Sequence, residues 1–196
     1  MPDVNAVMSE ISRAAAAKQA RFTEVFGASY HPVLAYARRR VGADLAQDVV
    51  AEAFLAAWRN FEKLPPEPLP WLYRAAHFAI ANQRRAVARQ GKLDERAWLL
   101  ADSYAVPDHS ELVVADMELA AAFRALSEAD REVLRLAAWE GLTAAAIGEV
   151  IGCSPMAAKV RLHRARRRLS QRLRASMPQP NMPGPAAAAM TGKALK

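Results

Sequence analysis

The stretch from Ser154 to Arg174 constrains this chain more than any other part of its sequence. It contains eight lysines and arginines and no aspartate or glutamate. On a helical wheel its apolar residues fall within about 60° of one another, so a helix here has one buried stripe. That stripe comprises Ala158, Leu162, Ala165 and Leu169. The opposite arc is basic, which fits a groove lined by phosphates, where arginine and lysine also reach guanine edges.

Two short capped helices are predicted immediately before this basic helix. Ser127 begins a helix over Glu128–Trp139 with Asp130 at the capping-box spacing, and Thr143 caps a second helix over Ala144–Ile151. The breaks and the next helix start are supplied by Gly141, Gly152-Cys153, Ser154 and Pro155. Two short helices, a tight turn and a longer basic helix are the pattern of a helix-turn-helix, so we predict DNA binding by Ser127–Arg174. A solvated basic helix would not explain these caps, and a membrane-surface helix would have aromatic anchors that this stripe lacks.

The rest of the chain also predicts helices, and the fold class is all-α. Alanine is abundant and glycine scarce, with 8 in 196 residues. Pro32 suits a first helical turn and Gly42 a helix end, while the proline-rich segment 64–70 breaks the chain. The first 20 residues are either a frayed helix or disordered. The further predicted helices are Arg21–Ser29, Pro32–Val41, Asp44–Glu62, Trp71–Ala88, a short piece near Glu95–Leu100, and His109–Arg124.

Composition narrows the class of function. A formal net charge of +7 favours a polyanionic partner. The one cysteine, Cys153, allows no intrachain disulfide, and no apolar run is long enough to span a membrane, so we expect a cytoplasmic protein. We find no catalytic triad, no metal-ligand spacing among the histidines and no phosphate-binding glycine loop, so we predict neither an enzyme, nor a metal site, nor a cofactor.

Several segments resemble bacterial extracytoplasmic-function (ECF) sigma factors. In the second half, the residues from Ser154 to Arg166 resemble the closing helix of the family's region 4, and Leu126–Leu134 and Glu140–Thr143 fit the same domain. In the first half, region 2 is resembled by Phe22–Trp58, which includes the segment Asp48–Trp58, and by Trp71–Ala76, followed by Arg84-Arg85. The resemblance covers about Phe22–Arg174 with both blocks in the family's order.

The resemblance implies two small helical domains joined by a flexible linker. The expected division is an extension (1–20), region 2 (21–89), a linker (90–108), region 4 (109–174) and a disordered tail (175–196). In the family, region 2 docks on the clamp helices of core RNA polymerase and opens the minus-ten promoter element. Region 4 binds the minus-thirty-five element and the polymerase flap. An anti-sigma factor is a further candidate partner, and no direct membrane insertion is implied.

The resemblance also assigns candidate site residues. Core polymerase is expected to contact an acidic helix face with Asp48, Glu52 and Leu55, opposite a core stripe of Val50, Phe54, Ala57, Trp58 and Phe61. The minus-ten candidates are Tyr73, Arg74, His77, Arg84 and Arg85. The minus-thirty-five candidates are Thr143, Met156, Lys159, Val160, Arg161, His163, Arg164 and Arg167.

The sequence departs from the family pattern at several of these positions. His77 stands where arginine is common, and Phe78 stands where asparagine is common. Ala157 and Ala158 replace a usual Thr-Val pair, and Val160 replaces a common serine. A free-standing helix-turn-helix regulator that binds duplex DNA without polymerase remains the alternative at this point.

Overall fold

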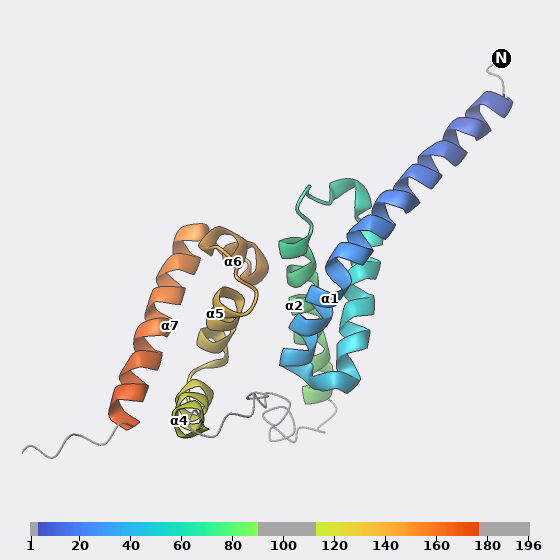
Figure 1. Cartoon of the computed structure of the whole chain (residues 1–196). Helices are drawn as coiled ribbons and strands as arrows, with labels where there is room; N and C mark the ends of the chain where they lie inside the picture. Colours follow the sequence, from blue (N-terminus) through green and yellow to red (C-terminus); the bar gives the residue numbers. More distant parts are fainter. Residues whose placement is uncertain (1–3, 90–112, 177–196) are drawn as a thin grey trace, which may run out of the picture.

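The computed structural model describes residues 4–89 and 113–176, and every regular element in those ranges is helical (Figure 1). This confirms the all-α prediction. The elements are α1 (Val4–Arg59), a 3-10 turn η1 (Phe61–Lys63), α2 (Leu69–Arg89), α4 (Val113–Arg124), α5 (Glu128–Ala138), α6 (Ala144–Ile151) and α7 (Pro155–Ser176). We call α1, η1 and α2 the N-terminal unit, and α4 to α7 the C-terminal unit.

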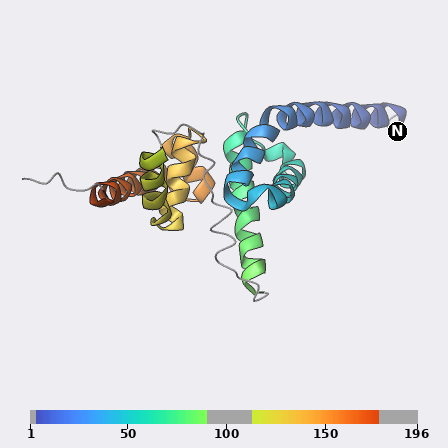
Figure 2. The same cartoon turned by 60° about the horizontal axis from the view of Figure 1, so that its bottom comes forward.

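Helix α1 consists of two arms that meet at Gly42. Gly42 has φ 77° and ψ −179°, a left-handed φ that favours glycine, and there the chain turns back on itself (Figure 1). The first arm covers residues 4–41 and the second covers 43–59. The beginning of the first arm projects away from the rest of the protein in both views (Figure 2). Gly42 therefore ends a helix as predicted, and the first 20 residues are helical from Val4 onward.

The predicted break before Pro32 is wrong. The first arm runs straight through Pro32, so Arg21–Ser29 and Pro32–Val41 are one helix. A proline inside a helix removes one backbone hydrogen bond. Val33, the next residue, and Tyr36, one turn later, are both 0% exposed, and we attribute the continuous helix to this tertiary packing.

The N-terminal unit packs α2 against both arms of α1. Helix α2 begins at Leu69, two residues earlier than predicted, because Pro70 fits the first turn, where no intrahelical partner is required of its nitrogen. The aromatic rings of Phe22 and Trp58 lie 5.0 Å apart, edge to face. Trp58 was expected in the core but is 40% exposed, since it lies at the edge of this cluster with Lys18 Nζ 5.0 Å from its ring centre.

The C-terminal unit forms the predicted helix-turn-helix. The side chains of Ser127, Thr143 and Ser154 cap α5, α6 and α7, each accepting a hydrogen bond from the backbone N–H three residues later at 3.2, 3.3 and 3.2 Å. Asp130 does not complete the expected capping box, because Arg168 Nη1 donates to both of its carboxylate oxygens at 2.8 Å. This ion pair ties α5 to α7.

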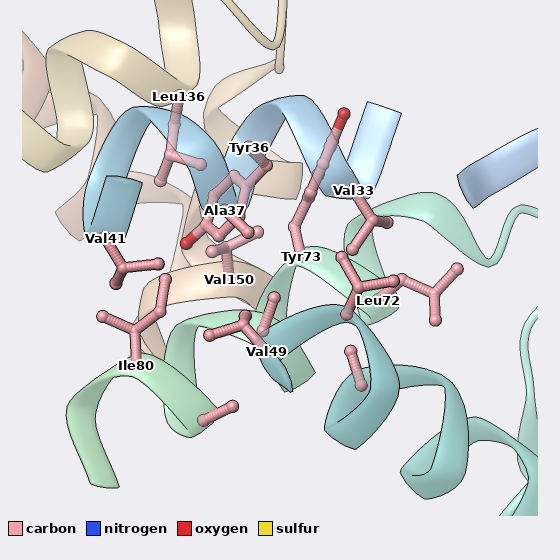
Figure 3. Close-up of a cluster of buried hydrophobic side chains, with 14 of the residues drawn as sticks. Val33, Tyr36, Ala37, Val41, Val49, Leu72, Tyr73, Ile80, Leu136 and Val150 are labelled. Atoms are coloured by element: carbon pink, nitrogen blue, oxygen red, sulfur yellow. The ribbon is translucent and has the colours of Figure 1, made fainter. Parts of the chain in front are cut away.

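The two units share one hydrophobic core. Leu136 of α5 and Val150 of α6 are both 0% exposed and lie beside Tyr36 and Ala37 of α1 (Figure 3). Helices α2 and α6 are also in contact. The C-terminal unit is therefore packed on the N-terminal unit rather than standing apart from it.

Some predictions concern residues outside the described ranges. These are the linker character of 90–108, the helical piece near Glu95–Leu100, the start of the helix predicted from His109, and most of the disordered tail predicted for 175–196. The first two residues of that tail, Ala175 and Ser176, are helical and belong to α7. Within the described ranges, no helix combines the length and the apolar character needed to cross a membrane.

The turn before α7 yields a stability prediction. A Cβ on Gly148 would lie 2.7 Å from the carbonyl oxygen of Cys153, inside a turn that the Cys153 N–H closes by donating to the Gly148 carbonyl at 2.9 Å. Gly148→Ala should therefore lower the free energy of unfolding by about 1–3 kcal/mol, measured by thermal or urea unfolding. Gly27→Ala is the control: nothing lies within 4 Å of a Cβ there, so it should stabilise α1 by about 0.5–1 kcal/mol. Equal stability of Gly148→Ala and the unmodified chain would contradict this account of the turn.

Candidate nucleic-acid interface and docking surfaces

Helix α7 carries the most complete candidate surface. Its predicted apolar stripe faces inward, with Ala158 and Ala165 at 0% exposure and Leu162 and Leu169 packed against the core. The predicted front is exposed along its whole length. It comprises Met156, Lys159, Val160, His163, Arg164 and Arg167. The buried and exposed sides of α7 are therefore the ones that the helical wheel predicts.

Two further candidates flank this front. Arg161 is exposed rather than part of the buried stripe. Thr143 is exposed at the start of α6, and its Oγ1 accepts the Ala146 N–H. The hydroxyl proton of Thr143 remains able to donate to a phosphate oxygen.

A mixed acidic and apolar face lies on the second arm of α1. Asp48, Glu52 and Leu55 are all exposed, Leu55 at 47%, and their spacing of four and three residues places them on one side of the helix. The opposite side, with Val50, Phe54 and Ala57, is buried. Acidic groups around an exposed leucine suit a protein partner with a complementary basic surface.

The minus-ten candidates on α2 are not all on one surface. Arg74 and Arg85 are exposed, and Arg85 donates to Asn82 of the same helix. Tyr73 is only 3% exposed, with its ring stacked on Tyr36 at 5.0 Å, and burial raises the pKa of its phenol. A ring in that position cannot stack on a nucleic-acid base without unpacking the core.

A hollow of about 320 Å³ opens between α1 and α2 beside Arg74. Among its lining residues are Glu52, Asn60, Trp71, Arg74, Phe78 and Asn82. Phe78 is 46% exposed, and the Arg74 guanidinium carbon lies 5.5 Å from its ring centre. An exposed ring beside a guanidinium fits an unpaired base and its phosphate. Sequence reasoning noted Phe78 only as a departure from the family pattern, although an exposed aromatic residue on a polar helix face was a usable signal.

Two other minus-ten candidates, His77 and Arg84, face the C-terminal unit. His77 Nδ1 lies 3.7 Å from Glu132 Oε1, and Arg84 Nη1 lies 3.2 Å from Glu128 Oε1. Both carboxylates belong to α5. The side chain of Arg84 is 37% exposed, so its ion pair is screened by water and contributes little by itself.

A buried ionic cluster joins the same two units. Arg40 of α1 donates from Nε to both carboxylate oxygens of Glu132 at 2.9 and 3.2 Å, and the Tyr36 hydroxyl donates to Glu132 Oε1 at 3.1 Å. Glu140, just beyond α5, accepts from Arg39 at 2.7 Å and from Arg40 at 3.1 Å. Sequence reasoning missed all of these groups, because their pairing joins residues 92 or more positions apart.

The charges in this cluster stabilise one another. Burial alone raises the pKa of Glu132, but the Arg40 charge, the Arg40 hydrogen bonds and the nearby His77 outweigh burial and lower the pKa to about 2. Burial acts against the charged form of Arg40, yet the neighbouring Tyr36, Glu132 and Glu140 raise its pKa above the ordinary value. Glu132 and Arg40 are therefore a charged pair held inside the protein.

Known proteins match both units. Residues 25–90 match the family described as Sigma-70 region 2, and residues 116–169 match Sigma-70, region 4. The chain is 31% identical over 157 residues to the RNA polymerase sigma factor NccH of Alcaligenes xylosoxydans xylosoxydans, covering 73% of this chain and 82% of that protein. It is 28% identical over 166 residues to the ECF RNA polymerase sigma factor SigL of Mycobacterium tuberculosis, covering 83% of this chain and 94% of that protein.

Two solved structures are similar in fold. One is CnrH in complex with the cytosolic domain of CnrY, with a TM-score of 0.55, 24% identity, and coverage of 85% of this chain and 96% of that one. The other is the sigma factor RpoE in complex with the anti-sigma factor NepR from Bartonella quintana, with a TM-score of 0.60, 20% identity, and coverage of 80% and 99%. At these identities the likeness supports a shared fold alone.

The lowered pKa of Glu132 predicts how stability depends on pH. The carboxyl titrates near 4.3 in the unfolded chain and at about 2 in the folded one, so its contribution is present above about pH 4.5 and lost as the pH falls toward 2. The difference corresponds to a loss on the order of 3 kcal/mol. Urea unfolding at pH 6 and pH 3 should therefore show a smaller loss of stability for Glu132→Gln than for the unmodified chain. Equal losses in the two proteins would mean that Glu132 is not a strongly stabilised carboxylate.

Proposed function

Because this chain belongs to the sigma-70 family and is an RNA polymerase sigma factor of the ECF type, we propose that α7 reads the minus-thirty-five promoter element through its exposed front. Sigma factors bind core RNA polymerase and promoter DNA, and they are regulatory rather than catalytic. The single observation that carries the proposal is the continuous exposure of the basic front while its apolar back is buried. The free-standing regulator is not favoured, because both sigma regions are matched in order.

The front of α7 divides into two kinds of contact. Lys159, Val160, His163 and Arg164 lie where the helix would enter the major groove, and we assign them to base edges. Met156 borders the same groove. Arg167, Arg161 and Thr143 lie where phosphate contacts would fix the position of the helix on the duplex.

The N-terminal unit supplies the polymerase contact in this proposal. Asp48, Glu52 and Leu55 form the docking face, and their exposure on one side of the second arm supports the assignment. Acidic groups around an apolar centre would steer and fix a basic partner surface. This face lies on the same helix as Val50 and Phe54, so docking would be coupled to the rigid core of the unit.

The minus-ten element would meet the same unit beside the hollow between α1 and α2. Arg74 and Phe78 line that hollow, and Arg85 is exposed further along α2; these side chains suit a single strand, whose bases stack on rings and whose phosphates bind cations. His77 and Arg84 join them only when their contacts with α5 are released. Tyr73 is left out of this set because it is buried.

We further propose region 2 and region 4 boundaries near residues 21–89 and 109–174, and action in the cytoplasm, where polymerase and promoters are found. The solved neighbours CnrH and RpoE are bound by the cytosolic domain of CnrY and by the anti-sigma factor NepR. A protein inhibitor of this general kind is therefore a candidate partner for this chain.

The role of α7 is tested by Arg164→Ala. Loss of a bidentate contact should weaken binding to the upstream element by about 1–3 kcal/mol and relax the preference at one base pair. Binding to a set of upstream elements, each changed at one base pair, measures both effects. Arg166→Ala is the control, since it removes the same charge from an exposed position beside the front and should weaken all sequences about equally. A uniform loss for Arg164→Ala would reduce Arg164 to a phosphate contact.

The polymerase role is tested by reconstitution with core enzyme. The purified chain and core polymerase should form a complex and start transcription at specific promoters. Glu52→Lys should weaken that complex, because it places a positive charge on the acidic docking face, whereas Glu24→Lys makes the same charge reversal at an exposed position outside that face. Equal core affinity for the two variants would remove the docking assignment. Failure of the unmodified chain to form a complex with core polymerase and to start transcription would overturn the proposed function itself.

A further inference from the structure

We propose that the projecting start of α1 adds a second contact with core RNA polymerase, by packing an apolar seam against a helix of the polymerase. This arm seam consists of Met8, Ile11 and Ala15, which are all exposed. It lies outside residues 25–90, the part of the chain that matches Sigma-70 region 2. The inference rests on the proposed function for the identity of the partner, because it extends the docking face on the second arm.

The arm seam is the uncovered end of a longer pattern. Alternating spacings of three and four residues place five side chains on one side of the helix, which is the spacing that packs one helix against another. These side chains are Met8, Ile11, Ala15, Lys18 and Phe22. Lys18 and Phe22 are partly buried, whereas Met8 and Ile11 are 57% and 58% exposed. The pattern therefore continues past the point where the protein itself covers it.

The covered part of the pattern shows what kind of element the arm seam lacks. The Phe22 ring lies 5.0 Å from the Trp58 ring and 6.4 Å from the Phe54 ring, and both partners belong to the second arm of α1. Lys18 Nζ lies 5.0 Å from the Trp58 ring centre. The second arm ends at Arg59, while the first arm continues away from it in both views (Figures 1 and 2). A helix placed beyond Arg59 would cover the arm seam as the second arm covers Phe22.

The projecting arm owes its helical form to its composition. It contains Ala14–Ala17 followed by Lys18, Gln19 and Ala20, all of which favour helix. A short helix with one bare side is nevertheless marginal in water, because tertiary packing supplies most of the stability of a helix. The amide hydrogens of this arm should therefore exchange readily in the free chain and become protected when a partner covers the seam.

Exposed apolar surface connects the arm seam to the docking face. Leu55 of the docking face and Trp58 are three residues apart on the second arm, so they are neighbours on its surface, and they are 47% and 40% exposed. Trp58 in turn contacts Phe22 and Lys18 at the base of the projecting arm. A protein seated on the docking face is therefore already beside the arm.

A second copy of this chain is the rival occupant. Two facing arm seams would contribute only three side chains each, one of them an alanine, and would bury much less than the roughly 1,200 Å² of total surface that specific interfaces reach. As an addition to a contact already formed, the same seam contributes without a second full loss of translational and rotational freedom. The observations therefore favour the polymerase as the partner.

Hydrogen exchange of the full chain tests the contact without any substitution. Amides of residues 8–18 should exchange at least about tenfold more slowly when the chain is bound to core polymerase. A tenfold increase in the concentration of the free chain should leave their exchange unchanged. Unchanged exchange on binding polymerase would overturn the inference. Protection that appears with concentration alone would also overturn it, in favour of a second copy.

The matched variants are Ala15→Glu and Ala20→Glu. Both positions are exposed alanines of the same arm, but Ala20 lies about 140° round the helix from Ala15 and outside the seam. Ala15→Glu places a charge in an apolar contact and should lower the affinity for core polymerase about 3- to 10-fold. Ala20→Glu makes the same change in net charge and should leave that affinity unchanged. Both variants should keep the circular dichroism and the duplex affinity of the unmodified chain, since α7 is untouched.

Equal core affinity of the Ala15→Glu and Ala20→Glu proteins would reject the arm contact. Glu52→Lys in the same assay separates this result from a failure of the docking face. If Glu52→Lys weakens the complex and Ala15→Glu does not, the arm contact is wrong and the docking face stands. If the unmodified chain forms no complex with core polymerase, the arm contact and the proposed function are both rejected.

Discussion

Taking a guanidinium and a carboxylate out of water is costly unless each satisfies the other, and Arg40 and Glu132 meet that condition across two separate helical units. Tyr36 donates its hydroxyl hydrogen to Glu132 and has its ring centre 3.5 Å from Arg40 Cζ, and the same side chain lies beside the buried Leu136 and Val150 (Figure 3). Apolar burial and charge pairing therefore stabilise the same contact, the one between the N-terminal and C-terminal units. Because both are confined to one side of α5 and α6, the opposite side of the C-terminal unit is left to carry α7 and its basic front.

The sequence predicted those parts of the fold whose causes are local. Ser127, Thr143 and Ser154 signal helix starts within a few residues of themselves, and Ala158 and Ala165 signal a buried stripe through their spacing. Where tertiary packing decides, the same reasoning failed. Pro32 was read as a helix start because proline favours the first turn, and no local pattern showed that packing would keep the helix continuous through it.

The candidate site residues show the same difference between local and long-range causes. Exposure of Lys159 and Arg164 follows from helix geometry, so the sequence sufficed for α7. The surroundings of Tyr73 and His77 depend on residues far away in the chain, Tyr36 and Glu132, which no local pattern connects to them. A single sequence thus identifies which residue types suit a nucleic acid, but not which of them already have a partner within the protein.

The separation of anchoring and reading sides on α7 has a consequence for how such a protein can change. Every group that fixes the helix, from Ala158 to the Arg168–Asp130 pair, lies off the reading front. Substitutions at Lys159, His163 or Arg164 therefore leave the packing of the helix intact. Under the role proposed for this front, promoter preference would therefore change one side chain at a time, with no compensating change in the core.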